Sequence, residues 1–362
     1  MVDTLPDKAR KGRGAVANPD GRFEPETRVR IDDGWGTLDQ ETEEPPPIQT
    51  TVSIDATRTI IARNQSPDIP FSQSINPYRG CEHGCIYCYA RPTHAYFGLS
   101  TGLDFETKLF AKPDAAKLLA EELRKPGYKP SAIALGTNTD PYQPIEREMK
   151  ITRSVLETLA AFNHPFSIVT KSALVVRDLD IIAPMAAKRM ARVFISVTTL
   201  DRELARKLEP RASTPPKRLE AIKALAGAGV PIGIMTAPII PALTDWEIER
   251  LLEAGRAAGA QSAGYTVMRL PFEIKDLFAQ WLEAHAPGKA KHVLSLVRQV
   301  RDGKLNDPNF GTRMRGTGTY AELIAKRHRL ACERLGFNRN DWSLDLTRFK
   351  PPPAPGDQLT LL

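Results

Sequence analysis

Five short apolar runs along the middle of the chain limit the folds that this sequence can adopt. They read SAIALG, PFSIVT, RVFISVTTL, VPIGIMTA and SAGYTVM, at residues 131–136, 165–170, 192–200, 230–237 and 262–268. Each run is too short for a buried helix and too continuously apolar for a sheet with one face in water. Such runs are typical of buried parallel strands. We therefore expect a parallel sheet that is covered by helices.

Helical patterns lie between these runs. One helix is expected to begin at Pro215, and Thr244 with Glu247 forms a capping-box pattern for another. Strands that alternate with helices predict an α/β fold with right-handed crossovers. About six such units fit between residues 71 and 285, which is fewer than a full eight-fold barrel needs. The expected architecture is therefore a partial (β/α)6 TIM-like barrel.

The two ends of the chain have the composition of unstructured tails. Residues 1–47 are polar and rich in Gly and Pro, with a basic start before the acidic stretch IDDGWGTLDQETEEPPP. This segment has too little apolar surface to offset the entropy of ordering, so we expect a disordered tail, with an interaction arm as the alternative. Residues 351–362 form a second, Pro-rich tail. Between the tails we expect a core domain at 48–285 and a mainly helical extension at 286–350.

Composition and charge narrow the range of partners and compartments. The chain has 362 residues and a formal net charge of +7, which allows a polyanionic partner without requiring one. No apolar run approaches the ~20 residues that a membrane helix needs, so no membrane partner is expected. The first residues lack the apolar stretch of a secretory signal. We therefore expect a cytoplasmic protein whose thiols stay reduced.

Three cysteines, Cys81, Cys85 and Cys88, fall within the stretch RGCEHGCIYCYA. Cysteine thiolates select zinc or iron–sulfur clusters. Structural zinc is usually four-coordinate, and His83 or His94 could supply the fourth ligand. A cubane cluster accepts three protein thiolates and leaves one iron open to a small molecule. The spacing alone leaves both kinds of metal site open.

The spacing Cys81-x-x-x-Cys85-x-Tyr87-Cys88 resembles the C-x3-C-x-aromatic-C signature of radical S-adenosylmethionine (SAM) enzymes. It follows the first expected strand, as it does in that superfamily. The longer strings SINPYRGCEHGCIYCYARPTHAYFG, LGTNTDPYQPIER, TTLDRELARKLEPRASTPPKRLEAI and APIIPALTD are similar to the spore photoproduct lyase-like branch. The resemblance covers roughly residues 71–270, so the core domain is expected to be of the radical SAM type.

The resemblance implies a [4Fe-4S] cluster held by the three cysteines, with one iron that chelates SAM. It implies an electron donor such as flavodoxin or ferredoxin, because SAM is cleaved reductively to a 5′-deoxyadenosyl radical. That radical abstracts a hydrogen atom from the substrate. The cofactor carries the difficult step, and the protein supplies position and excludes water. The resemblance does not identify the substrate or any catalytic side chain.

Candidate SAM contacts follow the expected strands, because open α/β sheets bind ligands beyond the carboxyl ends of their strands. Thr137, Asn138 and Asp140 come directly after the run 131–136, and the resemblance implies that this loop receives the SAM ammonium. The Gly-Gly-Glu often found there in the family is absent. An Asx turn ahead of Pro141 is the alternative for Asn138 and Asp140.

Further candidate contacts lie on later strands. Lys171 follows the run 165–170 and is a candidate for the SAM carboxylate, with Arg211 as the competing cation. Ser196 and Thr198 have period-two spacing and would face the same side, where their hydroxyls could reach the ribose. The resemblance implies that Tyr87 packs near the adenine. For the strand hydroxyls, a hydrogen bond to a neighbouring side chain is the alternative.

The chain departs from spore photoproduct lyase at one position of consequence. In that enzyme an additional cysteine, tens of residues after the cluster, donates a hydrogen atom, whereas this chain has no cysteine between Cys88 and Cys332. This departure counts against photoproduct reversal. Cys332 is expected to be a packed helix residue.

The region after residue 320 is basic, and nucleic acid is therefore a candidate partner. Its cations are Lys326, Arg327, Arg329, Arg334, Arg339, Arg348 and Lys350. A solvated helix face is the simpler interpretation of these residues. The two functional hypotheses are a radical SAM enzyme of unidentified substrate and a zinc-stabilised nucleic-acid-binding protein without catalysis.

Overall fold

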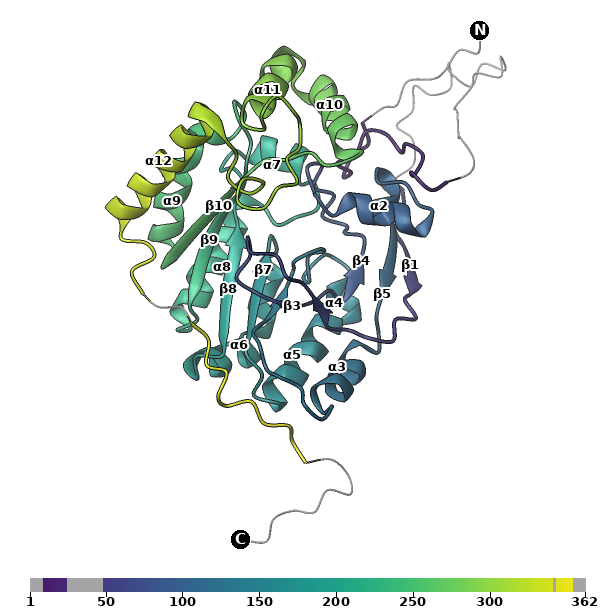
Figure 1. Ribbon diagram of the computed structural model, residues 1–362, viewed down its shortest axis with the longest axis vertical. Helices are drawn as coiled ribbons and strands as arrows, with labels where there is room; N and C mark the ends of the chain where they lie inside the picture. Colours follow the sequence, from purple (N-terminus) through teal and green to yellow (C-terminus); the bar gives the residue numbers. More distant parts are fainter. Residues whose placement is uncertain (1–8, 25–47, 341–342, 354–362) are drawn as a thin grey trace.

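A seven-stranded sheet lies at the centre of the computed structural model, which describes residues 9–24, 48–340 and 343–353 (Figure 1). The strands run in the order β10-β9-β8-β7-β6-β3-β2, and every neighbouring pair is parallel except β2 with β3. They are β2 (Ala62–Arg63), β3 (Gln73–Ile75), β6 (Ile133–Leu135), β7 (Phe166–Thr170), β8 (Ala191–Ser196), β9 (Ile232–Ile239) and β10 (Ser262–Val267). The parallel strands thus follow one another in chain order.

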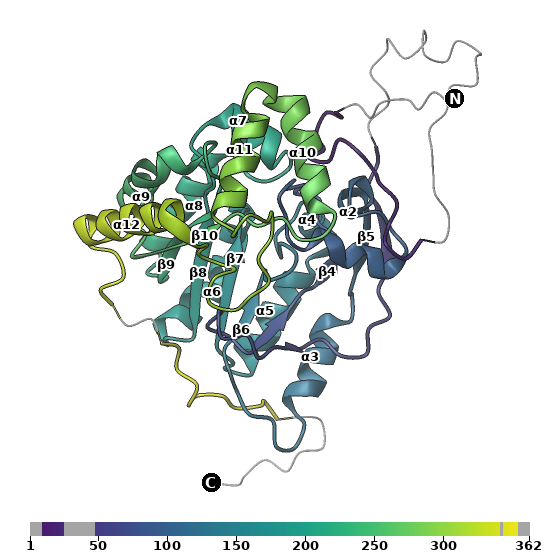
Figure 2. The ribbon, with the colours of Figure 1, turned by 45° about the horizontal axis from the view of Figure 1, so that its top comes forward.

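Helices connect these strands and cover the sheet (Figure 1 and Figure 2). They include α3 (Ala115–Leu123), α4 (Glu146–Met149), α5 (Ile151–Ala161), α6 (Leu179–Ala187), α7 (Arg202–Leu208), α8 (Pro215–Gly227) and α9 (Ile248–Ala257), with the 3-10 helices η2 (Ala173–Asp178) and η3 (Asp245–Glu247). Six parallel strands in chain order with helical crossovers make the partial (β/α)6 barrel, so the predicted fold class is confirmed.

One row of residues explains why the strands read as unbroken apolar runs. Leu135, Ile168, Val193 and Ile232 are register neighbours across four strands, and none of them is exposed. A sheet covered by helices on its outer face and closed around the barrel interior on the other has no broad solvent face on which polar residues would alternate. The apolar pattern of the sequence therefore reports burial at the middle of the barrel.

The capping-box prediction at Thr244 and Glu247 is wrong. The hydroxyl of Thr244 accepts the N–H of Ile240 at 3.0 Å, and Glu247 accepts the N–H of Leu200 at 3.2 Å and the hydroxyl of Thr199. Glu247 therefore connects the segment before α9 with the segment that follows β8. Sequence spacing cannot reveal a partner that lies 48 positions earlier in the chain.

A second, three-stranded sheet with the order β1-β5-β4 was not expected from the sequence. Its strands are β1 (Thr51–Ile54), β4 (Tyr78–Arg79) and β5 (Lys108–Ala111). The cysteines lie between β4 and β5, together with η1 (Arg91–Phe97) and α2 (Leu103–Thr107). The small sheet therefore holds both ends of the segment that carries the cysteines.

The C-terminal part is helical, as expected. It contains α10 (Ile274–His285), α11 (Pro287–Gln299) and α12 (Gly318–Leu335), with α10 against α11 and α12 beside α9 (Figure 1). No helix in the described part of the chain is both long and apolar enough to cross a membrane. Of the expected Pro-rich tail, residues 354–362 lie outside the described residues.

Residues 9–24 differ from the disordered tail that we expected over 1–47. Residues 13–17 are buried, and both views show this segment beside α2 and close to α10 (Figure 1 and Figure 2). The contacts that order it are made to charged and polar groups far along the chain, which a composition argument cannot detect. Residues 1–8 and 25–47 lie outside the described residues.

Candidate active site

The cysteine loop, residues 80–90, leads from the second sheet towards the barrel. Cys81, Cys85 and Cys88 are free thiols, of which the first two are buried and the third is partly buried. Burial, the Asp140 carboxylate and the other two thiols raise the pKa of Cys81 well above its usual value. A metal that binds these sulfurs must therefore displace their protons.

Two local turns shape the loop that carries the three thiols. The N–H of Gly84 donates to the carbonyl of Cys81 at 3.3 Å, and the N–H of Cys88 donates to the carbonyl of Cys85 at 3.2 Å. Gly84 has a φ of +65°, a left-handed conformation that favours glycine between the first two cysteines. The N–H of Cys81 is held by the carbonyl of Phe105 at 2.9 Å.

The donor set fits an iron–sulfur cluster. Within the described residues, no three His, Cys, Asp or Glu side chains converge on a single ion position. A cluster does not require such convergence, because each thiolate binds a different iron. The two histidines considered as zinc ligands have other partners: His83 Nδ1 lies 3.3 Å from Asp140, and His94 Nε2 lies 2.8 Å from the carbonyl oxygen of Lys108.

Tyr87 belongs to a buried polar network. Its hydroxyl donates to Glu209 and lies 3.2 Å from the hydroxyl of Thr198, which itself donates to Glu209 at 2.6 Å. The other carboxylate oxygen of Glu209 pairs with Arg218. Burial by itself raises the pKa of Glu209, but Arg218, Lys171 and the two hydroxyl donors lower it to about 2.

Sequence reasoning missed Glu209 and Arg218, although both lie in the string that carried the resemblance. Glu209 stands two residues before Arg211, and Arg218 lies on α8. In a sequence, this glutamate and this arginine cannot be distinguished from charged residues on the surface. In the structure their side chains are each only 1% exposed.

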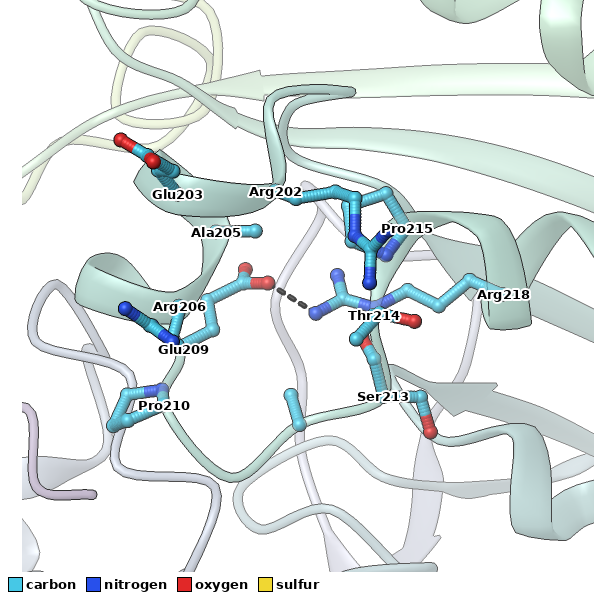
Figure 3. Close-up of a pocket in the computed structure, with 11 residues that line it drawn as sticks. Arg202, Glu203, Ala205, Arg206, Glu209, Pro210, Ser213, Thr214, Pro215 and Arg218 are labelled. Carbon is cyan, nitrogen blue, oxygen red and sulfur yellow. Dashed lines mark hydrogen bonds and ion pairs between the residues drawn. The ribbon is translucent and has the colours of Figure 1, made fainter.

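A cavity of about 330 Å³ borders this ion pair. Its lining comes from α7, the N-terminus of α8 and the segment between them, and Figure 3 shows Glu209 and Arg218 pointing toward one another across it. Arg202 and Arg206 also line the cavity, and no carboxylate of the described residues pairs with either. The cavity therefore shares a wall with the carboxylate that binds Tyr87.

The structure distinguishes the two candidate cations. The ammonium of Lys171 lies 5.8 Å from the centre of the Tyr87 ring and has no carboxylate partner within the described chain. Burial and the Glu209 carboxylate raise the pKa of Cys85 above its usual value, and the positive charge of Lys171 opposes this rise. Arg211 pairs with Glu82 at 3.0 Å. Lys171 is therefore the cation beside the cysteine loop that an added carboxylate can reach.

The loop after β6 places Asp140 in backbone contacts. Its carboxylate accepts the N–H of Tyr142 at 2.9 Å, which is an Asx turn, the N–H of Lys171 at 2.7 Å and the hydroxyl of Thr170 at 2.7 Å. Burial alone raises its pKa, but His83 and these donors lower it to about 2. Asp140 thus forms the Asx turn of the alternative interpretation, and it also binds the end of β7.

Thr137 and Asn138 occupy the same loop. The carbonyl of Thr137 accepts the hydroxyl of Tyr89, and the N–H of Asn138 donates to Asn76 at 3.0 Å. The side chain of Asn138 has no hydrogen-bond partner among the described residues and is partly exposed. It is the polar group of this loop that is left to bind a ligand.

Ser196 and Thr198 are both buried, but they are engaged differently. The hydroxyl of Thr198 is shared between Glu209 and Tyr87, as the alternative of a neighbouring partner held. Ser196 ends β8, and its carbonyl accepts from Arg218 at 2.9 Å. The sequence predicted that both residues lie at the end of the same strand, and the structure shows in addition that Thr198 belongs to the polar network of Tyr87.

The basic C-terminal side chains are largely paired with acids. Arg327 pairs with Glu249 at 2.6 Å, and Arg334 pairs with Glu253 at 2.6 Å. Arg329 and Arg348 pair with Glu333 and Asp345. These pairs favour the solvated helix face over a phosphate track. Cys332 is buried on α12, beside His328, in agreement with a packed residue.

Comparisons with known proteins show the family of the chain. A family model described as the Radical SAM superfamily matches residues 75–255. An uncharacterized protein of Mycobacterium tuberculosis is 38% identical over 277 residues, which span 75% of this chain and 79% of the relative. An uncharacterized protein of Methanocaldococcus jannaschii is 30% identical over 173 residues, which span 48% of this chain and 62% of the relative.

Solved structures of spore photoproduct lyase share the fold. One of them, with bound AdoMet and dinucleoside spore photoproduct, has a TM-score of 0.56 at 18% identity and covers 79% of this chain and 80% of its own. The family model spans half of the chain and includes all three loop cysteines. The chain is therefore an enzyme that belongs to the radical SAM superfamily.

Proposed function

We propose that this enzyme holds a [4Fe-4S] cluster at Cys81, Cys85 and Cys88 and cleaves SAM there to abstract a hydrogen atom from its substrate. The observation that carries the proposal is a loop of three free thiols beside Lys171, a cation that has no carboxylate partner among the described residues. Membership in the superfamily implies SAM and an iron–sulfur cluster. When bound, the reduced cluster supplies the electron that cleaves the sulfonium of SAM.

The residues of the chain have separate tasks in this proposal. The three thiolates bind three irons and leave the fourth for the amino and carboxylate groups of SAM. Lys171 pairs with the SAM carboxylate, with Arg211 as the weaker candidate because Glu82 already binds it. Tyr87, fixed through its hydroxyl by Glu209, packs against the adenine.

The other contacts are polar groups at the strand ends. Thr137 and Asn138 line the loop that meets the SAM ammonium, and Asp140 orders that loop through its backbone contacts. Ser196 is the candidate for the ribose hydroxyls, and Thr198 is the weaker one because its hydroxyl already donates to Glu209. Burial of Ser196 and Thr198 would help to exclude water from the reactive radical.

Radical SAM enzymes need a reductant, and we propose that a flavodoxin or a ferredoxin fills this role in the cytoplasm. Nucleic acid is the substrate class that we infer, because structures with this fold hold a dinucleoside spore photoproduct. Photoproduct reversal is not part of the proposal, since no cysteine lies between Cys88 and Cys332.

The test is an anaerobic preparation of the full chain. We expect about four irons per chain by the cubane assignment, and 5′-deoxyadenosine after reduction with dithionite in the presence of SAM. Cys85→Ala should remove both, whereas Cys332→Ala should retain both. A colourless, zinc-loaded chain that binds DNA equally well with and without SAM would overturn the proposal in favour of a zinc-stabilised binding protein.

A further inference from the structure

A fully buried arginine, Arg91, binds backbone carbonyls of the cysteine loop. Its Nε donates to the carbonyl of Cys85 at 2.9 Å and its Nη2 to the carbonyl of Gly84 at 3.1 Å. Its Nη1 donates to the carbonyls of Thr101 and Gly102. The guanidinium is 0% exposed, so this charge cannot be screened by water.

The hydrogen bond from Arg91 to the Gly84 carbonyl fixes the orientation of the peptide group between Gly84 and Cys85. In a trans peptide the N–H points opposite to the preceding carbonyl. The carbonyl of Gly84 faces Arg91, so the N–H of Cys85 points away from Arg91, and no described group accepts it. The next N–H, of Ile86, also points away and donates to the carbonyl of Leu208 at 3.0 Å. The N–H of Cys85 is thus left for a sulfur atom.

A buried carboxylate balances the charge of Arg91. Glu106 pairs with Nη2 of Arg91 at 2.5 Å, and both side chains are 0% exposed. The carboxylate also accepts the N–H of Gly14 at 3.0 Å and the N–H of Ala15 at 2.8 Å. Both of these donors come from residues 13–22, which we call the N-terminal strap.

The backbone of the strap packs directly against the backbone of the cysteine loop and of the residue before α2. A Cβ atom at Gly14 would lie 1.8 Å from the carbonyl oxygen of Gly84, and a Cβ atom at Gly102 would lie 2.2 Å from that of Ala17. Arg13 donates to the carbonyls of Glu106 and Ile48. The strap therefore leaves no room for a side chain between Gly14 and the Gly84 carbonyl.

Side-chain contacts hold the strap further along. Asn18 and Asp104 exchange two hydrogen bonds, one through the backbone N–H of Asp104 at 2.9 Å and one through the amide of Asn18 at 3.1 Å. Arg22 pairs with Glu273 at 2.6 Å, directly before α10. The strap therefore joins the cysteine loop to the C-terminal helices.

We propose that Arg91 and Glu106, held by the N-terminal strap, are positioning residues that aim the Cys85 amide at the cluster and set the charge beside it. This inference rests on the proposed cluster at the three cysteines. Hydrogen bonds to cluster sulfurs and net charge are two of the determinants of the reduction potential of an iron–sulfur centre. The pair is therefore part of the machinery that adjusts this potential.

Two charge variants test the electrostatic part of the proposal. In Glu106→Gln the positive charge of Arg91 is unbalanced and favours the reduced cluster, so the midpoint potential rises. In Arg91→Met the carboxylate is unbalanced, so the potential falls. Both are measured by redox titration followed by electron paramagnetic resonance. Shifts in the same direction, or no shift in either, would overturn the inference.

A measurement on the cluster-free chain tests the strap. Gly14→Ala places its new Cβ against the Gly84 carbonyl, whereas Gly227→Ala meets nothing within 4 Å and is the matched control. We expect faster hydrogen–deuterium exchange in peptides covering 81–88 for Gly14→Ala and Glu106→Gln, and the wild-type rate for the control. An unchanged rate in Gly14→Ala refutes the positioning role.

The two parts also separate this inference from the proposed function. A wild-type chain that takes up no cluster defeats the proposed function, and the exchange experiment then shows the strap to be structural only. A wild-type chain with a normal cluster whose potential does not respond to Glu106→Gln and Arg91→Met defeats the inference alone. A variant that loses the cluster while its loop exchanges at the wild-type rate also counts against it.

Discussion

The buried pair of Glu209 and Arg218 allows a quantitative prediction. In Arg218→Met the Glu209 carboxylate loses its guanidinium partner while its side chain stays buried. Removing one member of a buried pair costs about 3–5 kcal/mol of stability. Burial alone raises the pKa of Glu209, and Arg218 is the largest of the causes that lower it to about 2, so the carboxylate depends on this partner to stay charged inside the protein.

Thermal unfolding followed by circular dichroism measures the effect. With an unfolding entropy of about 2.1 cal/mol/K per residue, the expected loss lowers the Tm of Arg218→Met by about 4–7 °C at pH 7. The exposed pair of Arg329 with Glu333 supplies the control, because Arg329→Met should change stability by less than about 1 kcal/mol.

The sign of the pH dependence is a second readout. In the wild type the folded pKa of Glu209 lies below its unfolded value, so its contribution is complete above pH 4.5 and disappears as the pH falls through about 2. In Arg218→Met burial raises that pKa, since the largest opposing cause is gone. The difference in unfolding free energy between wild type and variant should therefore become smaller as the pH falls from 8 to 5.

The double variant Glu209→Gln with Arg218→Met can refute the reasoning. It removes the unpaired buried charge and should recover a large part of the stability that Arg218→Met loses. If the losses of the two single variants simply add, the pair does not interact as the structure implies. A gap that stays constant with pH would contradict the assignment of the charge to Glu209.

Three further predictions concern the site. Lys171→Met should weaken SAM binding by tenfold or more, about 1.4 kcal/mol, with the iron content unchanged, whereas Arg211→Met should weaken it less; equilibrium dialysis with labelled SAM measures both, and equal effects would contradict the assignment of Lys171. Asp140→Asn should lower the Tm more at pH 7 than at pH 3, because the contribution of a carboxylate with a pKa of about 2 is complete above its unfolded value of 3.8 and declines as the pH falls towards 2. Cys332→Ala should leave 5′-deoxyadenosine formation at the wild-type rate in a chromatographic assay, and a loss would assign this buried thiol a role in the reaction.

Local pattern was sufficient where burial itself leaves a pattern in the sequence. The runs at 165–170 and 262–268 became β7 and β10, because strands covered on both faces carry mostly apolar or small residues and show no regular polar alternation. Pro215 begins α8 as expected, because its ring suits the first turn of a helix. The spacing of the three cysteines likewise indicated a metal site, because ligands in one loop are close in space whatever surrounds them.

The tertiary structure alone decided which charged groups support the site. Tyr87 meets Glu209 across 122 positions of sequence, and Arg13 meets Glu106 across 93. Composition described residues 1–47 as a tail, yet Gly14 lets the strap approach the cysteine loop, and Gly102 lets it approach the start of α2. A sequence determines by itself the features that neighbouring residues encode, namely the strands, the helix starts and the thiol spacing. Buried ion pairs are decided only by the fold, because neither residue differs in the local sequence from a surface charge, even where the partners are only 9 positions apart, as Glu209 and Arg218 are.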